Sequence, residues 1–188
     1  MAHSSNDERR REEIFEEIYR AHYDAVARYA LRRARSPDDA VDVIGETFLT
    51  AWRRLDDLPD GDGARLWLYG VARRVLANHR RGAARRELLA TRLRGEFAEA
   101  APARPAETVA VRAAFGRLSD DDRELLSLTG WEGLSPGEIA EVLGCRAGAV
   151  RARLHRARKR FARALAREGV DVERYGARAV AMAEGALG

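Results

Sequence analysis

The stretch GCRAGAVRARLHRARKRF, residues 144–161, decides how the second half of this 188-residue chain folds. Between Cys145 and Arg167 the sequence has nine lysine or arginine residues and no acidic residue. Apolar residues interrupt this charge at intervals of four, three and four, at Val150, Leu154, Ala157 and Phe161. Because that spacing matches the period of an α-helix, it predicts a helix with one apolar stripe against a core. The opposite face is a basic ridge, formed by Arg151, Ala152, His155, Arg156, Lys159 and Arg163.

The residues before this helix predict a shorter helix and a tight turn. Ser135 can cap a helix start, Pro136 suits the first helical position, and Glu138 completes a capping box. Gly144 can take the left-handed conformation that ends a helix, and the next helix begins near Ala147. Together they predict a helix-turn-helix, a unit whose second helix enters the DNA major groove. A helical hairpin whose charge only solvates it remains the alternative.

The charges of the whole chain are segregated along the sequence. The formal net charge is only +4, from 34 basic and 30 acidic residues. Residues 38–62 nevertheless hold eight acids and two bases, and residues 73–94 hold eight arginines and one acid. The chain therefore carries one acidic and two basic surfaces. A basic surface is the electrostatic requirement for binding nucleic-acid phosphates.

Helical periodicity extends over the rest of the chain and predicts an all-α fold. Apolar residues recur with helical spacing over residues 14–30, 40–55 and 66–76, and Ser36 with Pro37 resembles the capped start at Ser135. Residues 96–107, EFAEAAPARPAE, have two prolines and no apolar periodicity, which is typical of a linker. We therefore expect two small helical domains joined by a flexible linker.

The predicted domain bounds follow from these patterns. Residues 1–11 are polar and charged, and we expect a disordered tail there. The two domains are predicted at residues 12–95 and 108–168, and residues 169–188 form a C-terminal extension with no assigned role.

Composition argues against several classes of site. Cys145 is the only cysteine, so no internal disulfide forms and a reducing cytoplasm is favoured; we expect a small buried residue there. The four histidines lack metal-ligand spacing, and no phosphate loop or catalytic triad stands out. No apolar run approaches the length of a membrane span. We expect no enzyme activity, no metal, no cofactor and no membrane insertion.

Three motifs, in order, carry a resemblance to a known family. They are DDAVDVIGETFLTAWRRL, then WLYGVARRVLANHRR and, after the linker, LSPGEIAEVLGCRAGAVRARLHRARKRF. Together they resemble bacterial RNA polymerase sigma factors of the sigma-70 family, extracytoplasmic-function (ECF) group, over residues 12–165. The resemblance implies domains similar to regions 2 and 4 of larger sigma factors. It also implies three partners: core RNA polymerase, promoter DNA and an anti-sigma factor.

The resemblance further implies three sets of contact residues. The first motif is similar to the segment that docks on the clamp helices of the largest polymerase subunit. It places Phe48 in the core and, on the docking face, Asp42, Gly45, Glu46, Leu49 and Arg53. The second motif resembles the reader of the minus-ten element, with the candidates Trp67, Tyr69, Arg73, Arg74, Asn78, His79, Arg80, Arg81 and Arg85. The third resembles the reader of the minus-35 element, with the candidates Arg146, Arg151, Arg153, His155, Arg156 and Lys159.

Physical chemistry supports these implied roles. A melted strand is held by a cationic track and by aromatic surfaces on which bases stack. Trp67 and Tyr69 supply aromatic rings, although the apolar neighbours of Trp67 favour a core position for it. Asn78 and His79 are suited to polar contacts with bases.

The chain departs from the family pattern at five positions, the first of which is Val41 where glutamate is usual. Gly45 stands where glutamine is usual, and a glycine inside a helix costs about 1 kcal/mol relative to alanine. Arg74 replaces a common asparagine. Ala149 and Ala152 replace a threonine and a serine, so phosphate contact depends more on the neighbouring arginines.

The sequence thus predicts a promoter-specificity subunit and not a catalyst. In that mechanism the acidic helix binds core polymerase, the helix-turn-helix anchors on upstream duplex, and the first domain captures the opened strand. The alternative is a stand-alone helix-turn-helix regulator that acts without core polymerase, although this leaves the first domain unexplained.

Overall fold

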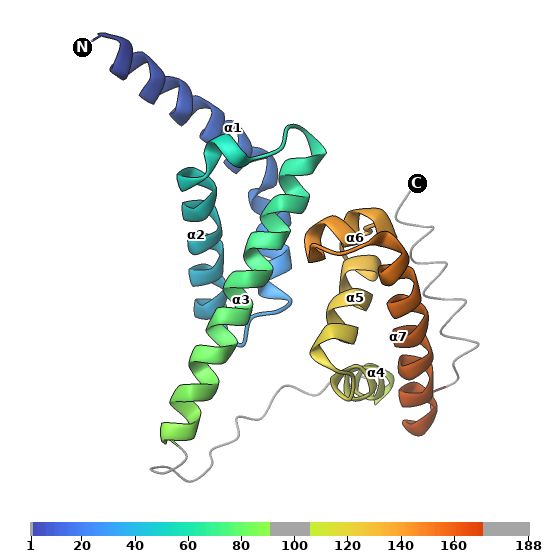
Figure 1. Cartoon of the computed structure of the whole chain (residues 1–188). Coiled ribbons are helices and arrows are strands. Elements are labelled where there is room, and N and C mark those ends of the chain that lie inside the picture. Colours follow the sequence, from blue (N-terminus) through green and yellow to red (C-terminus); the bar gives the residue numbers. More distant parts are fainter. Residues whose placement is uncertain (1, 91–105, 171–188) are drawn as a thin grey trace. The chain divides into compact units, whose positions relative to one another are not determined.

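The computed structural model describes residues 2–90 and 106–170, with the side chains of residues 7–82 and 109–170. All regular elements in these ranges are helical (Figure 1). They are α1 (Ala2–Leu31), α2 (Pro37–Arg53), the short 3-10 helix η1 (Leu55–Asp57), α3 (Asp62–Ala90), α4 (Ala106–Gly116), α5 (Asp120–Gly130), α6 (Pro136–Leu143) and α7 (Ala147–Arg167). The chain divides into two compact units, which contain α1–α3 and α4–α7. The prediction of two all-α domains is confirmed.

In the first unit α1, α2 and α3 all pack on one another. Their shared core contains Val26 from α1, Phe48 and Ala51 from α2, and Leu68 from α3. Phe48 is 4% exposed, which places it in the core as predicted. Apolar side chains every three or four residues bring one face of each helix to this core.

Helix α2 begins as its sequence predicts. The Ser36 hydroxyl accepts a hydrogen bond from the Asp39 backbone N–H at 3.1 Å, and Pro37 occupies the first helical position. Asp38 and Asp39 lie in the first turn, where negative charge interacts favourably with the helix dipole. This start sets which face of α2 is buried and which is exposed.

Helix α1 begins at Ala2, so the prediction of a disordered tail over residues 1–11 is wrong for the residues that the structure describes. Arginine and glutamate are good helix formers, and polarity alone does not oppose a helix. Arg11 also fixes this part of α1 to η1. Its Nη1 donates to both carboxylate oxygens of Asp56, at 2.9 and 2.8 Å, and its guanidinium lies 6.0 Å from the Trp52 ring centre.

Helix α3 is longer than its apolar pattern predicts. The pattern ends toward Gly82, whereas α3 continues to Ala90. The glycine does not end the helix because it keeps a helical conformation with negative φ. Most of the predicted linker, residues 96–107, lies outside the described residues, but residues 106 and 107 already belong to α4. Of the predicted C-terminal extension, residues 171–188 lie outside them as well.

In the second unit α7 packs against α4, α5 and α6. Its predicted apolar stripe is confirmed, because Val150, Leu154 and Ala157 are buried and Phe161 is half-buried. Phe161 packs on a small cluster formed by Ala114 of α4 with Ala164 and Leu165 of α7.

The helix-turn-helix is formed by α6 and α7. The Ser135 hydroxyl accepts from the Glu138 N–H at 3.3 Å, and the Glu138 carboxylate accepts from the Ser135 N–H at 2.8 Å, so the predicted capping box is present. Gly144 ends α6 with φ 65° and ψ 41°, the left-handed conformation that favours glycine. Both local predictions are confirmed.

Cys145 is exposed, so its predicted burial is wrong. Its backbone N–H donates to the Ala140 carbonyl at 2.9 Å and so helps to close the end of α6. The backbone carries this role while the side chain faces outward. None of the described helices combines the length and the apolar character needed to cross a bilayer.

Candidate polymerase and nucleic-acid interfaces

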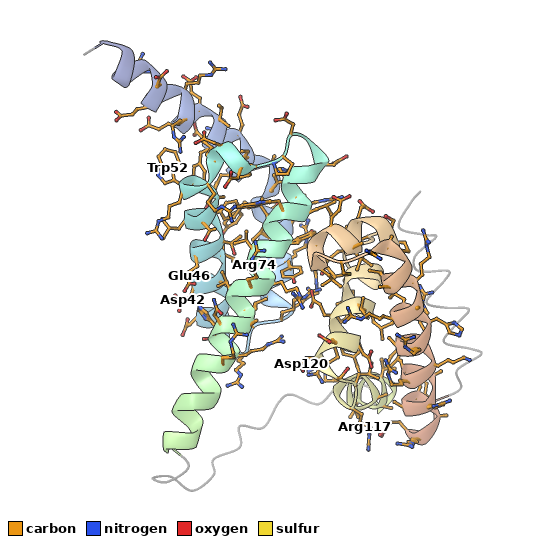
Figure 2. All side chains as sticks on the ribbon, in the orientation of Figure 1. Asp42, Glu46, Trp52, Arg74, Arg117 and Asp120 are labelled. Carbon is orange, nitrogen blue, oxygen red and sulfur yellow. The ribbon has the colours of Figure 1, made fainter. Side chains whose placement is uncertain are left out.

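The five predicted polymerase-docking residues share the exposed face of α2. They are all exposed and are separated by three, one, three and four residues: Asp42, Gly45, Glu46, Leu49 and Arg53. The opposite face of the helix is buried, and there Thr47 donates from its hydroxyl to the Val43 carbonyl at 2.6 Å. The result is a surface with apolar Leu49 between two carboxylates and one arginine. Asp42 and Glu46 are labelled on α2 in Figure 2.

Gly45 lies within this face in regular helix. A Cβ atom placed on it would meet nothing within 4 Å. Glycine is therefore not required by packing inside the first unit, and its lack of a side chain leaves the middle of the docking face flat.

An aromatic cluster borders the same face on the α1 side. Phe48 and Trp52 of α2 contact Phe15, Tyr19 and Tyr23 of α1, with ring-centre distances between 4.7 and 6.5 Å. The sequence pattern predicts the core position of Phe48 but not this cluster, because the α1 aromatics occur in that pattern only as periodic apolar residues. The cluster fixes how α1 and α2 pack.

The two aromatic candidates on α3 prove to be packing residues. Tyr69 is 4% exposed and stacks on Tyr29, with ring centres 4.9 Å apart. Its predicted role as an exposed stacking surface for bases is therefore wrong. Trp67 is half-buried and packs against the core, with the Arg54 guanidinium 5.7 Å from its ring centre. This is the core position that its neighbours favour.

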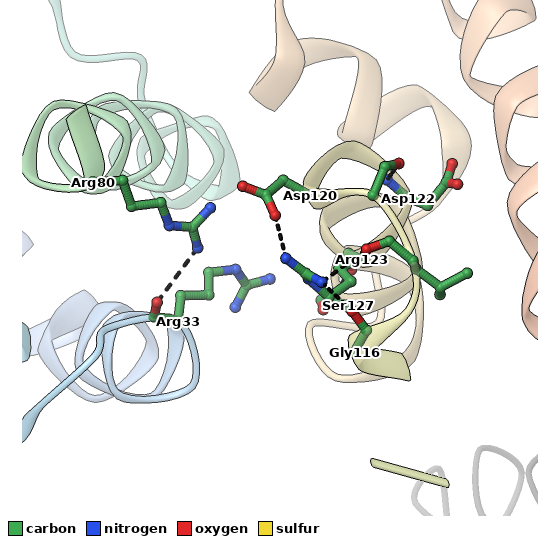
Figure 3. A network of polar contacts seen from close by, with 9 residues as sticks. Arg33, Arg80, Gly116, Asp120, Asp122, Arg123 and Ser127 are labelled. Carbon is green, nitrogen blue, oxygen red and sulfur yellow. Dashed lines mark hydrogen bonds and ion pairs between the residues drawn. The ribbon is translucent and has the colours of Figure 1, made fainter. Parts of the chain in front are cut away.

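The polar candidates on α3 lie farther along the helix, and several have partners in the unit. Arg74, Asn78 and Arg81 are exposed, while Arg73, His79 and Arg80 are half-buried. Arg81 Nη2 donates to Asn78 Oδ1 at 2.5 Å. Arg80 Nη2 donates to the Arg33 carbonyl at 3.4 Å (Figure 3). The side chain of Arg85 lies outside the described residues.

One contact joins the two predicted surfaces of the first unit. His79 Nε2 lies 2.9 Å from Glu46 Oε1, across a separation of 33 residues in the sequence. The His79 side chain is 25% exposed and the Glu46 side chain 53% exposed. No local sequence pattern indicates this pairing.

Most candidates in the second unit lie on the exposed face of α7. Arg151, His155, Arg156 and Lys159 are exposed, and among residues 109–170 no hydrogen bond or ion pair engages their side chains. Arg146 is exposed at the N-cap position of α7. Arg153 differs, because its Nη2 lies 3.3 Å from an Asp121 carboxylate oxygen of α5. The structure thus brings the predicted minus-35 candidates together on one helix.

Asp122, a residue with no predicted contact to α7, fixes that helix to α5. Arg160 donates twice to Asp122, from Nε at 2.5 Å and from Nη2 at 2.6 Å. The Asp122 side chain is 7% exposed, and hydrogen bonding from Arg160 lowers its pKa while the same contact raises the pKa of Arg160. The sequence signal was only the capped start of α5, where the Ser119 hydroxyl accepts from the Asp122 N–H at 3.2 Å.

Arg123 joins α4 to α5 in the same unit. Its Nη1 donates to the Gly116 carbonyl at 2.9 Å and to the Leu118 carbonyl at 2.8 Å, and its Nη2 pairs with Asp120 (Figure 3). These bonds satisfy one carbonyl at the end of α4 and one in the connection that follows, neither of which has a helical partner. Together with the Asp122–Arg160 pair, they form a scaffold beneath the helix-turn-helix.

Comparisons with known proteins agree with this architecture. The sigma-70 region 2 family matches residues 18–86, and the sigma-70 region 4 family matches residues 108–161. The ECF RNA polymerase sigma factor SigL of Mycobacterium tuberculosis is 32% identical over 143 residues, covering 73% of this chain and 81% of SigL. EcfG of Rhodopseudomonas palustris is 29% identical over 148 residues, covering 76% of this chain and 80% of EcfG.

Solved structures show the same likeness. The sigma factor RpoE of Bartonella quintana, in complex with the anti-sigma factor NepR, superposes with a TM-score of 0.63 and 25% identity, covering 80% of this chain and 96% of that one. The chain belongs to the sigma-70 family of RNA polymerase sigma factors, in its ECF group. It is an alternative sigma factor that binds core RNA polymerase and directs promoter recognition, and not an enzyme.

Proposed function

We propose that the exposed face of α2 is the polymerase-docking surface of this sigma factor. The proposal is supported by the shared exposure of Asp42, Glu46, Leu49 and Arg53 over a rigid, aromatic-packed base. An apolar centre with charged residues around it is the usual composition of a specific protein interface. Gly45 leaves room for a close approach at its middle.

The exposed cations of α7 form the proposed minus-35 reader. Arg151 and His155 lie in the N-terminal half of α7, the end that faces base edges in a helix-turn-helix. Arg146, Arg156 and Lys159 are assigned to phosphates, and Arg153 is a phosphate contact whose direction Asp121 sets. The observation that carries this assignment is that the side chains of Arg151, His155, Arg156 and Lys159 have no partners among residues 109–170, so they need not exchange an internal bond for DNA.

The outer part of α3 is the proposed minus-ten surface. It comprises the polar candidates Arg73, Arg74, Asn78, His79, Arg80 and Arg81, and Arg85 remains a candidate from sequence alone. Tyr69 is no longer part of it, and Trp67 supports it from the core. This surface supplies cations and hydrogen-bond donors, and the fold gives it no fully exposed ring among the two aromatic candidates.

An anti-sigma factor is a further proposed partner. RpoE of Bartonella quintana was solved with NepR, and CnrH, with 29% identity and a TM-score of 0.58, was solved with the cytosolic domain of CnrY. By analogy, an anti-sigma factor of this chain would cover the exposed face of α2 and compete with polymerase. The proposed compartment is the cytoplasm, where bacterial polymerase and DNA are found.

Run-off transcription with purified core polymerase tests these assignments. We expect initiation to depend on this chain, Leu49→Asp to abolish holoenzyme formation, and combined Arg151→Ala and Arg156→Ala to abolish promoter selection while holoenzyme still forms. Arg112→Ala, a matched loss of an exposed arginine on α4, should change neither step. Duplex binding without any initiation would instead support the stand-alone regulator.

A further inference from the structure

The contact between Glu46 and His79 connects the proposed polymerase surface on α2 to the proposed strand surface on α3. The two atoms lie 2.9 Å apart, and both side chains retain access to solvent. A carboxylate only accepts hydrogen bonds, so His79 Nε2 carries the proton and donates. Each of the two proposed surfaces therefore contributes one functional group to this hydrogen bond.

This bond limits what His79 can offer to DNA. While Nε2 donates to Glu46, that N–H is not available to an acceptor on a base edge. The Glu46 carboxylate also places a negative charge beside the strand surface, where it repels a phosphate backbone. Strand capture through His79 therefore requires that Glu46 release it.

The same bond limits what Glu46 can offer to polymerase. Its Oε1 accepts from His79, and a donor on the polymerase must share or replace that bond. The two side chains share one hydrogen bond and are partly exposed. Exposed ion pairs contribute little to stability, so replacing this bond with one to a partner costs little free energy. A contact of this kind can change partner without unfolding the unit.

We propose that the Glu46–His79 contact is an exchangeable link that couples polymerase docking to strand capture, with His79 as a positioning residue for Glu46. This inference rests on the proposed function of the two surfaces. A polymerase group that draws Glu46 away releases the His79 donor for the strand. By thermodynamic linkage, a strand that takes His79 raises the affinity for polymerase by the same factor.

The test begins with single-strand binding by the full chain alone, without polymerase. The probe is a fluorescein-labelled single-stranded oligonucleotide of mixed sequence, followed by anisotropy. Glu46→Ala should raise affinity by about two- to fivefold, the range expected for loss of one exposed pair. The matched control is Glu17→Ala, which removes an exposed glutamate of α1 outside both surfaces and should leave affinity unchanged.

A double-variant cycle separates the link from simple charge repulsion. In the His79→Ala background, Glu46→Ala should raise affinity by less than it does in the wild-type chain, because only the relief of charge repulsion remains and there is no donor left to release. Glu46→Gln, which keeps an acceptor for His79, should give a smaller gain than Glu46→Ala. Far-ultraviolet circular dichroism melting of each variant confirms that the first unit stays folded.

Coupling is then measured with core polymerase. Saturating oligonucleotide should raise the affinity of the wild-type chain for core polymerase, and this increase should vanish in His79→Ala. Additive effects in the cycle, or an equal gain from Glu17→Ala, would overturn the link. Those results differ from failure of the proposed function, in which the wild-type chain would not support initiation with core polymerase at all.

Discussion

Each unit of the chain sets a carboxylate against a basic side chain, and the two contacts differ in geometry and burial. Asp122 is nearly buried and accepts two bonds from Arg160, whereas Glu46 is half-exposed and accepts one bond from His79. A two-bond contact to a buried carboxylate is expensive to break because the carboxylate would remain without a donor. A single exposed bond can be replaced by water or by a partner. The Asp122–Arg160 contact therefore holds α5 and α7 together as a scaffold, whereas the Glu46–His79 contact can exchange partners and act as a switch.

The two proposed DNA-binding surfaces differ in the same way. On α7, Arg151, Arg156 and Lys159 have no partners among residues 109–170, so this surface is ready to bind. On α3, Asn78 and His79 are already engaged with other side chains of the unit. We infer that duplex anchoring needs no rearrangement, while strand capture requires internal bonds to be exchanged.

The largest predicted effect tests whether the α7 surface is ready to bind. Replacing both Arg151 and Arg156 by alanine should lower promoter affinity of the holoenzyme by about tenfold for each arginine, since contacts to bases and phosphates are each typically of this size. The logarithmic salt slope should also become less steep by about one, because Arg156 is the one of the two assigned to a phosphate and fewer counterions are released without it. Filter binding across a salt series measures both quantities.

An unchanged affinity in that experiment would show that the anchor lies elsewhere. The matched comparison replaces Arg74 and Arg81 on α3. If the comparison of surfaces is right, this pair should affect formation of the open complex more than initial duplex binding. Permanganate footprinting distinguishes these two steps.

The helix-turn-helix could be predicted from sequence because its determinants are local. The capping box spans four residues, Gly144 needs only its own φ, and the stripe from Val150 to Phe161 repeats every three or four residues. Such features depend on the near neighbours in the chain. The exposed face of α2 could be predicted for the same reason.

The contacts between elements could not be predicted from these patterns. Arg160 and Asp122 are 38 residues apart, Arg11 and Asp56 are 45 apart, and their pairing depends on how helices pack. Tyr69 shows the same limit. Its position beside an arginine-rich segment suits both a stacking surface and a core residue, and only the contact with Tyr29 decides between them.

The next prediction compares how much each carboxylate contributes to the thermal stability of its unit. Asp122→Asn should lower the melting temperature of the second unit by roughly 5 °C, the shift typical of losing a charge-assisted contact in a small domain. Glu46→Gln should leave the melting temperature of the first unit almost unchanged. Hydrogen exchange followed by mass spectrometry on the full chain reports on each unit separately. Equal destabilisation by both variants would remove the distinction between scaffold and switch.

Gly45→Ala should produce two smaller effects: it should raise the stability of the first unit and lower its affinity for core polymerase. The alanine should stabilise the first unit by about 1 kcal/mol, because a helical glycine loses more backbone entropy and its Cβ position is empty. The added methyl lies on the proposed docking face and should weaken core polymerase binding. Gly82→Ala is the control, since it is also helical with an empty Cβ position but lies on α3. Equal core affinity for both variants would place polymerase contact away from Gly45.

The smallest predicted effect is a difference between the units in their response to acid. Burial, and to a lesser extent the nearby Arg65, lower the pKa of His22 from 6.5 in the first unit. Below pH 6.5 the folded state then binds fewer protons than the unfolded state. Neutral His22 therefore contributes to the stability of the first unit, fully above pH 6.5, and this contribution is lost as pH falls toward the lowered pKa. Asp122 has its pKa lowered from 3.8, chiefly by hydrogen bonding from Arg160, so its stabilisation persists until the pH falls below that value. Hydrogen exchange at pH 7 and pH 5.5, corrected for the intrinsic rate, should show weakened protection in the first unit only. His22→Gln should abolish that weakening, because the glutamine does not titrate; persistence of the weakening in this variant would assign the acid response to another group.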